Sequence, residues 1–82
     1  MLNQSQFKGY IEEIISINGF NLAEYQDKYY FQKKVSEKLP EFTENEIYAV
    51  IQKFFGENLI SAKDSVTRVI DELFRMYIDK FK

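Results

Sequence analysis

No cysteine, histidine or tryptophan occurs in this 82-residue chain. Without histidine and cysteine, the protein has no imidazole base, no thiolate nucleophile and none of the nitrogen or sulfur ligands that usually hold zinc. Disulfide bonds are excluded as well, so packing alone must stabilise the fold. A catalytic site would have to be built from Asp, Glu, Lys, Tyr and Ser. We therefore expect no enzyme activity, no bound metal and no cofactor.

The acidic residues and the glycines form no catalytic or phosphate-binding motif either. Glu12–Glu13 and Asp71–Glu72 are adjacent carboxylates, but neighbouring side chains on a helix point about 100° apart, which prevents an acid–base pair. The three glycines lie far apart and make no glycine-rich loop for a phosphate group. These patterns indicate solvated surface charge, and we expect no small-molecule substrate.

Long hydrophobic runs and an excess of basic charge are also missing. No stretch of 18 apolar residues occurs, so the sequence predicts no membrane partner. The segment Met1–Gln6 lacks the basic and then apolar layout of a signal peptide, which favours a cytoplasmic setting. The formal net charge of −2 disfavours a general nucleic-acid binder, because such proteins usually carry a basic surface.

What the chain does have is a surplus of aromatic residues, with 8 Phe and 6 Tyr. Phe, Tyr, Ile, Asn and Lys make up 37 residues, whereas Ala, Gly, Arg and Pro make up only 9. This bias is typical of an AT-rich genome, so we expect a bacterial or phage protein. A single domain of residues 1–82 is small for one hydrophobic core, so most of the aromatic residues should be buried. Any that do not fit the core need a partner.

Apolar residues recur at helical spacing in four segments, and nothing alternates with the period of two that a strand requires. The predicted segments are about 4–18, 21–39, 43–56 and a long one that starts at 61. The fold class is therefore all-α, either a compact four-helix bundle or two helix-turn-helix hairpins packed together. A repeated Gly-x-Asn-Leu pattern at 19–22 and 56–59 is compatible with the hairpin form.

Residues that start or stop helices lie at the ends of these segments. Gly19 can adopt the left-handed conformation that ends a helix, and Pro40 explains why the second helix stops. Asn21 is suited to cap that second helix at its start. Thr43 and Glu46 have the spacing of a capping box. Because the connections are short, consecutive helices should be antiparallel neighbours.

In each segment the apolar residues form one face, which we expect to be the core. The face of the second segment covers about half of the helix circumference, so this helix should contact neighbours on two sides. The predicted core residues are Phe7, Tyr10, Ile11, Ile14, Ile15, Leu22, Tyr25, Tyr29, Phe31, Val35, Leu39, Ile47, Val50, Ile51, Phe54, Val66, Val69, Ile70, Leu73, Met76 and Tyr77.

Five apolar side chains lie away from these faces and are the candidate partner-binding residues. They are Tyr30, Phe55, Phe74, Ile78 and Phe81. The last three have i, i+4, i+7 spacing, which places them on one side of the fourth helix. Two interpretations remain open. These side chains widen the core, because a helix with two neighbours needs two apolar sides, or they form an exposed strip for a partner helix or for a second copy in a homodimer.

Nucleic acid is the alternative partner, on the evidence of one basic and aromatic stretch. Lys28, Lys33, Lys34 and Lys38 are interleaved with the aromatic residues at 29–31. This pattern is typical of a groove that follows phosphates and stacks bases. The opposing interpretation is that the aromatic residues belong to the core and the lysines to the solvent side of the helix.

A resemblance to DNA-binding proteins covers about 30 of the 82 residues. The segment from Glu46 to Gly56, followed by Leu59, residues 61–66 and residues 69–71, resembles the helical amino-terminal hairpin of HU-type DNA-binding proteins. It is also similar to the three-helix carboxy-terminal domain of the DEK family. The resemblance implies a helical hairpin and contact with DNA. The basic β-arms with which HU-type proteins grip DNA have no counterpart in this sequence.

These observations together predict a small cytoplasmic, non-enzymatic domain that acts by protein–protein contact through an apolar aromatic strip. Candidate roles are a regulator, an inhibitor or immunity-type protein, or an accessory subunit that covers a surface of a larger protein. The acidic net charge favours a partner with a basic face. A nucleic-acid-binding helical module is the alternative prediction.

Overall fold

The computed structural model describes residues 1–55 and 62–82. Within these residues the regular structure is helical and no strand occurs. The helices are α1 (Gln4–Asn18), α2 (Tyr25–Lys38), α3 (Glu44–Phe55) and α4 (Ala62–Lys80). The predicted all-α class is therefore confirmed. The predicted end of the third segment at 56, the predicted start of the fourth at 61 and the second Gly-x-Asn-Leu pattern at 56–59 lie outside the described residues.

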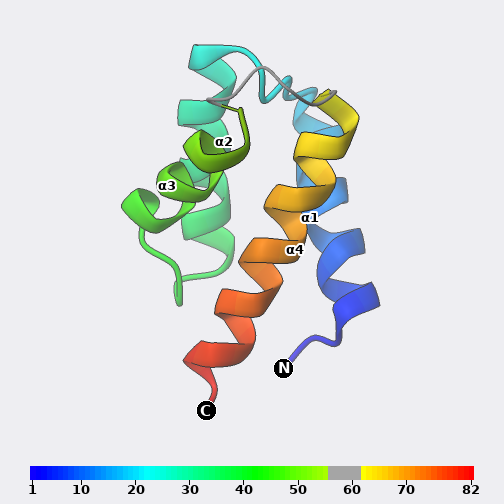
Figure 1. Cartoon of the computed structure of the whole chain (residues 1–82), viewed down its shortest axis with the longest axis vertical. Helices are drawn as coiled ribbons and strands as arrows, with labels where there is room; N and C mark the ends of the chain where they lie inside the picture. The colour runs from blue at the N-terminus through cyan, green and yellow to red at the C-terminus, as the bar shows by residue number, and fades with distance from the viewer. Residues whose placement is uncertain (56–61) are drawn as a thin grey trace.

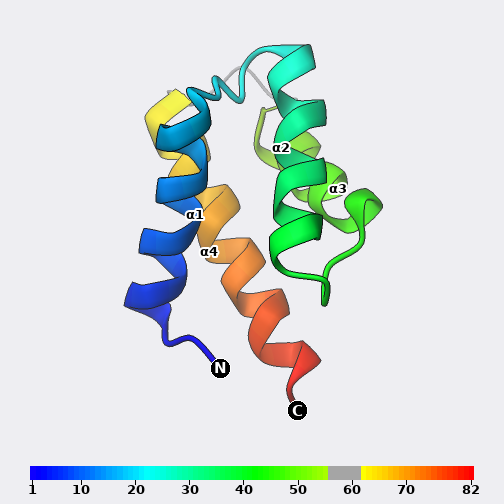
Figure 2. The same cartoon turned by 180° about the vertical axis from the view of Figure 1, so that it is seen from behind.

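The four helices form an up-and-down bundle (Figure 1 and Figure 2). Helices α1 and α3 run in one direction and α2 and α4 in the other, so both chain termini lie at the same end of the molecule. Helix α1 packs against α2 and α4, and α3 packs against the same two helices, which closes a ring of four. Each helix therefore has two neighbours, and α2 and α4 occupy diagonal positions. Of the two predicted architectures, this is the four-helix bundle.

Helix α1 begins and ends at defined caps. The Asn3 side chain accepts a hydrogen bond from the Gln6 N–H at 2.8 Å, and the Gln6 side chain accepts one from the Asn3 N–H at 3.0 Å. These reciprocal bonds form a capping box that the sequence analysis did not identify. At the other end, Gly19 has a φ of 65°, the left-handed conformation that glycine adopts without strain. The predicted end of this helix is confirmed.

Helix α2 begins later than predicted. Its N-cap is Glu24, whereas the predicted cap was Asn21. The Asn21 side chain instead accepts a hydrogen bond from the Ala23 N–H (3.1 Å), and the Asn21 N–H donates to the Asp27 carboxylate (2.8 Å). A side chain bonded to the backbone two residues ahead forms a turn, and this turn competes with the helix. The predicted start of α2 was therefore wrong.

Residues from all four helices and from the turns beside α2 form the core. The fully or almost fully buried apolar residues are Phe7, Ile11, Ile14, Leu22, Phe31, Val35, Leu39, Phe42, Ile47, Val50, Ile51, Val69, Ile70, Leu73 and Tyr77. The predicted faces of α1, α3 and α4 are confirmed, since the remaining members pack half-buried against this core. For α2 the prediction fails at Tyr25 and Tyr29, which are exposed. Phe42, in the α2–α3 connection, was missed.

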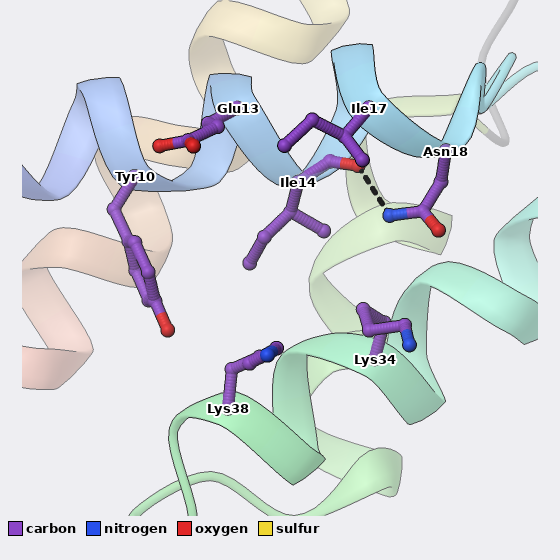
Figure 3. Close-up of a pocket in the computed structure, with 7 residues that line it drawn as sticks. All are labelled: Tyr10, Glu13, Ile14, Ile17, Asn18, Lys34 and Lys38. Carbon is purple, nitrogen blue, oxygen red and sulfur yellow. Dashed lines mark hydrogen bonds between the residues drawn. The ribbon is translucent and has the colours of Figure 1, made fainter.

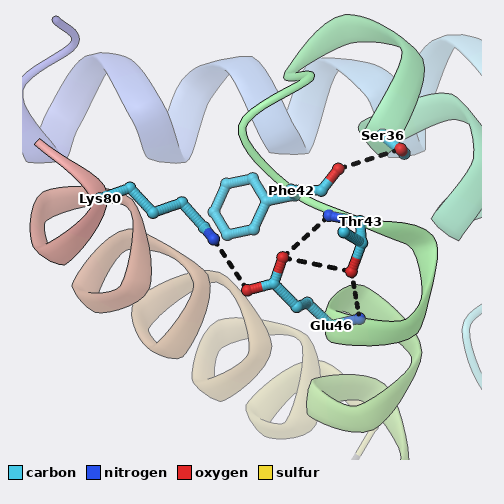
Figure 4. Close-up of polar contacts among 5 residues, drawn as sticks. All are labelled: Ser36, Phe42, Thr43, Glu46 and Lys80. Atoms are coloured by element: carbon cyan, nitrogen blue, oxygen red, sulfur yellow. Dashed lines mark hydrogen bonds and ion pairs between the residues drawn. The ribbon is translucent and has the colours of Figure 1, made fainter.

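Polar contacts hold the ends of three helices together at the α2–α3 connection (Figure 4). The Thr43 N–H donates to the Glu46 carboxylate at 2.9 Å, and the Thr43 hydroxyl accepts from the Glu46 N–H at 3.2 Å, which confirms the predicted capping box of α3. Lys80 of α4 donates to the same carboxylate at 2.8 Å and lies 5.3 Å from the Phe42 ring centroid. The Ser36 hydroxyl of α2 donates to the Phe42 carbonyl at 3.0 Å.

The surface between α1 and α2 is hollowed. It contains a cavity of about 250 Å³ that opens to the surface (Figure 3). Tyr10, Ile14 and Ile17 of α1 line one wall, and Lys34 and Lys38 of α2 line the other. We call this cavity the α1–α2 groove.

Candidate protein-binding surface

The structure does not bring the five predicted partner-binding residues together into one strip. Phe74 lies in the α1–α4 seam, where its ring centroid is 5.4 Å from that of Phe7. Phe55 and Ile78 are also half-buried and pack against the core. These three residues therefore widen the core, which was the first of the two interpretations of their sequence positions.

Phe81 and Tyr30 are the exposed members of the predicted set, and they lie on different helices of the ring. Phe81 follows the last residue of α4, is 48% exposed, and stacks edge-on over Tyr77 at a centroid distance of 4.9 Å. Tyr30 is 50% exposed on α2. Because α2 and α4 are diagonal in the bundle, Tyr30 does not extend a surface formed by the α4 residues.

Tyr30 instead belongs to a cluster of exposed tyrosines on α2. Tyr25 is 76% exposed and Tyr29 is 44% exposed, and both lie within the first two turns of the same helix. The Tyr29 and Tyr30 rings meet edge to face with their centroids 5.8 Å apart. We call Tyr25, Tyr29 and Tyr30 the tyrosine face.

The tyrosine face was not predicted, because the helical spacing of Tyr25 and Tyr29 assigns them to the core face. Helix α2 turns its Phe31, Val35 and Leu39 side inward, and at 100° per residue this leaves Tyr29 on the opposite side. The residue type itself favoured an exposed position. Tyrosine differs from the buried Phe31 by a hydroxyl group, which needs a hydrogen-bond partner when it is buried.

The four candidate lysines point to three sides of α2 rather than along one track. The ammonium group of Lys28 faces α3, where it donates to the Gln52 side chain at 3.4 Å and lies 5.8 Å from the Phe55 ring centroid. Lys34 and Lys38 face α1 across the α1–α2 groove (Figure 3). A single phosphate-binding row along the helix is therefore not formed by these residues.

Lys33 is the candidate lysine that belongs to the tyrosine face. Its ammonium nitrogen lies 5.0 Å from the Tyr29 ring centroid, within the range of a cation–π interaction. Hydrogen bonding with the Tyr29 side chain is the largest cause of an upward shift in the pKa of Lys33, so this lysine stays charged. The tyrosine face therefore offers aromatic surface, phenol hydroxyl groups and a fixed positive charge.

Within the part of the chain that the structure describes, neither a metal site nor a membrane-spanning helix is found. Among residues 1–55 and 62–82, no group of three or more Asp and Glu side chains could hold a metal ion. None of the helices described is long and apolar enough to cross a bilayer.

Comparison with protein-family models, with curated proteins and with solved structures found no match to this chain. The resemblance to HU-type proteins therefore gains no support. Evidence on function comes from the surface of the molecule itself, and above all from the tyrosine face.

Proposed function

We propose that this protein is a non-enzymatic protein–protein interaction domain that binds its partner through the tyrosine face. In this proposal it is a small cytoplasmic protein of bacterial or phage origin, acting as a regulator, an inhibitor or immunity-type protein, or an accessory subunit. The observation that carries the proposal is the exposure of Tyr25, Tyr29 and Tyr30 on adjacent turns of one helix. Phe81 is the one exposed phenylalanine, since the other seven are buried or pack half-buried against the core, so the exposed aromatic surface is concentrated on α2.

Tyrosines in such an arrangement have the properties of an interface core. Tyrosine is enriched at protein interfaces, because its ring contributes a large apolar area while its hydroxyl forms a directed hydrogen bond. An interface of standard size takes about 800 Å² from each partner. The tyrosine face would therefore be the centre of the contact, with the neighbouring surface of α2 as its rim.

A triple variant, Tyr25→Ser with Tyr29→Ser and Tyr30→Ser, tests this proposal. The matched control is Phe81→Ser, which removes an exposed aromatic ring from α4 instead. Each bait is used for affinity capture from a lysate of the native host, with bound proteins quantified by mass spectrometry. We expect a partner that wild type and Phe81→Ser retain and the triple variant loses, while far-UV circular dichroism shows all three folded. A partner lost only with Phe81→Ser would contradict the assignment to α2.

A homodimer is the alternative use of the same surface. Light scattering of the wild type over a wide concentration range distinguishes it from an external partner. A dimer that persists on dilution and dissociates in the triple variant would assign the tyrosine face to self-association.

Nucleic acid is the second candidate partner, favoured by the contact of Lys33 with Tyr29 and by the exposure of Tyr30 beside them. Aromatic rings next to a cation can stack bases of a single strand. Fluorescence anisotropy with a labelled single-stranded oligonucleotide tests this candidate at low and moderate salt. Phosphate binding should weaken steeply with salt, whereas apolar protein contact should persist.

A further inference from the structure

The α1–α2 groove combines exposed apolar surface with cationic groups (Figure 3). Ile17 is 74% exposed on the α1 wall, beside the buried Ile14. On the α2 wall stand Lys34 and Lys38. In the part of the chain that the structure describes, no ion pair or side-chain hydrogen bond involves their ammonium groups. The groove therefore offers an apolar contact and two cationic groups side by side.

The positive charge of the groove is confined to its α2 wall. Lys34 and Lys38 are one helical turn apart and therefore lie on the same side of α2. Glu13, the acidic residue of the lining, belongs to α1. The net charge of the whole chain is −2, so the groove is a local basic surface on an acidic molecule. Local charge, rather than net charge, decides which group binds at such short range.

We propose that the α1–α2 groove binds an acidic amphipathic helix of a partner protein. An apolar side chain of that helix would cover Ile14 and Ile17, and its Asp or Glu residues would pair with Lys34 and Lys38. This inference rests on the proposed function, protein–protein contact, and specifies the chemistry of the partner.

The size and shape of the groove favour a protein segment over a small molecule. Its volume of about 250 Å³ lies below the range of about 300–1,000 Å³ that is usual for small-molecule pockets. The walls are two antiparallel helices. A third helix that lies between them presents apolar residues one turn apart to the Ile14 and Ile17 side chains. Carboxylates at i and i+4 on that helix match the spacing of Lys34 and Lys38.

The groove also adjoins the tyrosine face. Tyr30, Lys34 and Lys38 follow one another at intervals of four residues, so they lie along one side of α2. A helix bound in the groove can therefore extend toward Tyr30. The aliphatic side chains of Ile14 and Ile17 suit an apolar side chain better than a nucleotide base, because bases stack on aromatic rings.

The test begins with selection from a display library of random peptides of about 16 residues, enough for four helical turns. The full-length chain is the bait. Enriched peptides are synthesised with a fluorophore, and their affinities are measured by anisotropy. The groove variants are the double variant Lys34→Glu with Lys38→Glu, and the single variant Ile17→Ser, which changes an exposed residue. The control, Lys8→Glu with Lys63→Glu, changes the net charge equally at other exposed positions.

We expect the enriched peptides to carry an apolar helical stripe flanked by Asp and Glu. Their affinity should fall at least about tenfold with the double groove variant and several-fold with Ile17→Ser. It should change by less than about twofold with the control variant, because the removed charges lie outside the groove. Circular dichroism of each variant confirms that it is folded, and Ile17→Ser keeps the test valid if the charge reversal unfolds the chain.

Several outcomes would overturn the inference. Peptides without acidic residues, peptides that bind the groove variants as well as wild type, or a library that yields no binder would each exclude an acidic helix. A labelled single-stranded oligonucleotide whose binding depends on Lys34 and Lys38 would assign the groove to nucleic acid. A dimer that Ile17→Ser dissociates would assign it to a second copy.

The failure of this inference is distinguishable from failure of the proposed function. If native partner capture depends on the tyrosine face while no acidic peptide binds the groove, the proposed function stands and the groove inference falls. If acidic peptides depend on Ile17, Lys34 and Lys38 while capture is unchanged by the tyrosine variant, the contact site is the groove rather than the tyrosine face.

Discussion

Phe74 and Phe81 are both aromatic residues near the end of the chain, but their surroundings differ. The Phe74 ring packs against Phe7 of α1 and lies 6.3 Å from Tyr77 in the same helix. Phe81 contacts Tyr77 and is 48% exposed. Removing a ring from a seam between helices leaves a cavity as well as losing buried area, whereas removing an exposed ring leaves no cavity.

We therefore expect Phe74→Ala to lower the free energy of unfolding by about 2–3 kcal/mol. Phe81→Ala should lower it by less than about 1 kcal/mol, as is usual for substitutions at exposed sites. Urea unfolding followed by far-UV circular dichroism measures both. A Phe74→Ala protein as stable as wild type would show that this ring is not part of the packed seam, and would favour its original assignment as a free partner-binding residue.

At the scale of a single helix, α1 has one glycine inside it and another at its C-cap, and the two have opposite roles. Gly9 lies inside the helix, while Gly19 is its C-cap with a φ of 65°. No heavy atom lies within 4 Å of a Cβ placed on either residue. Steric space is therefore equal at the two sites, and the backbone conformation alone distinguishes them.

Gly9→Ala should stabilise the protein by about 0.5–1 kcal/mol, because alanine is the better helix former and restricts the unfolded chain. Gly19→Ala should destabilise it by about 1 kcal/mol, because an L side chain is strained in the left-handed region. Thermal unfolding of the two variants beside wild type checks both signs in one experiment. Equal shifts in the same direction would show that Gly19 does not need its positive φ.

At the start of α2, a turn forms where the sequence predicts a helix N-cap. Asn21 has the residue type of an N-cap, but its side chain accepts from the Ala23 N–H in the preceding turn, and its own N–H donates to the Asp27 carboxylate of α2. Leu22 is buried and anchors that turn in the core. The helix therefore begins only at Tyr25, and this change moves Tyr25 from a predicted interior position to the first exposed turn.

For the molecule as a whole, the Glu46–Lys80 pair joins the start of α3 to the end of α4. Hydrogen bonds from Lys80 and from the Thr43 backbone lower the pKa of Glu46 below its ordinary value of 4.5. A carboxyl with a lowered pKa stabilises the folded state fully above the unfolded value, and this contribution is lost as the pH falls through the folded value.

Glu46→Gln tests this linkage, since glutamine keeps an oxygen for the Thr43 N–H but carries no charge for Lys80. We expect wild type to be more stable than the variant at neutral pH by about 0.5–1 kcal/mol, the range for a partly exposed pair. The difference should shrink as the pH falls below 4.5. Melting temperatures of wild type and variant across this pH range measure the difference. Both proteins contain the other carboxylates, such as Glu72, so the contributions of those carboxylates cancel. A difference that is constant with pH would contradict the pairing.

The number of helices and most of the core follow from the sequence, because both depend on local patterns. The period of 3.6 residues marks one apolar face in each segment, and capping residues such as Thr43 and Gly19 mark helix ends within a few residues. The candidate site was less predictable. Of its tyrosines, Tyr30 alone was placed outside the core from the sequence, because an aromatic residue fits the pattern of a core face whether or not a neighbouring helix covers it.

The sequence by itself therefore determined an all-α chain with four amphipathic helices and the residues each helix can bury. Only the tertiary structure decided which apolar residues stay uncovered. Helix α2 has aromatic residues on several sides, and its rotation is set by where α1 and α3 contact it. These contacts leave the tyrosine face in solvent and form the α1–α2 groove, whereas the contact between α1 and α4 places Phe74 in a seam. These outcomes depend on packing between distant segments, which no local period encodes.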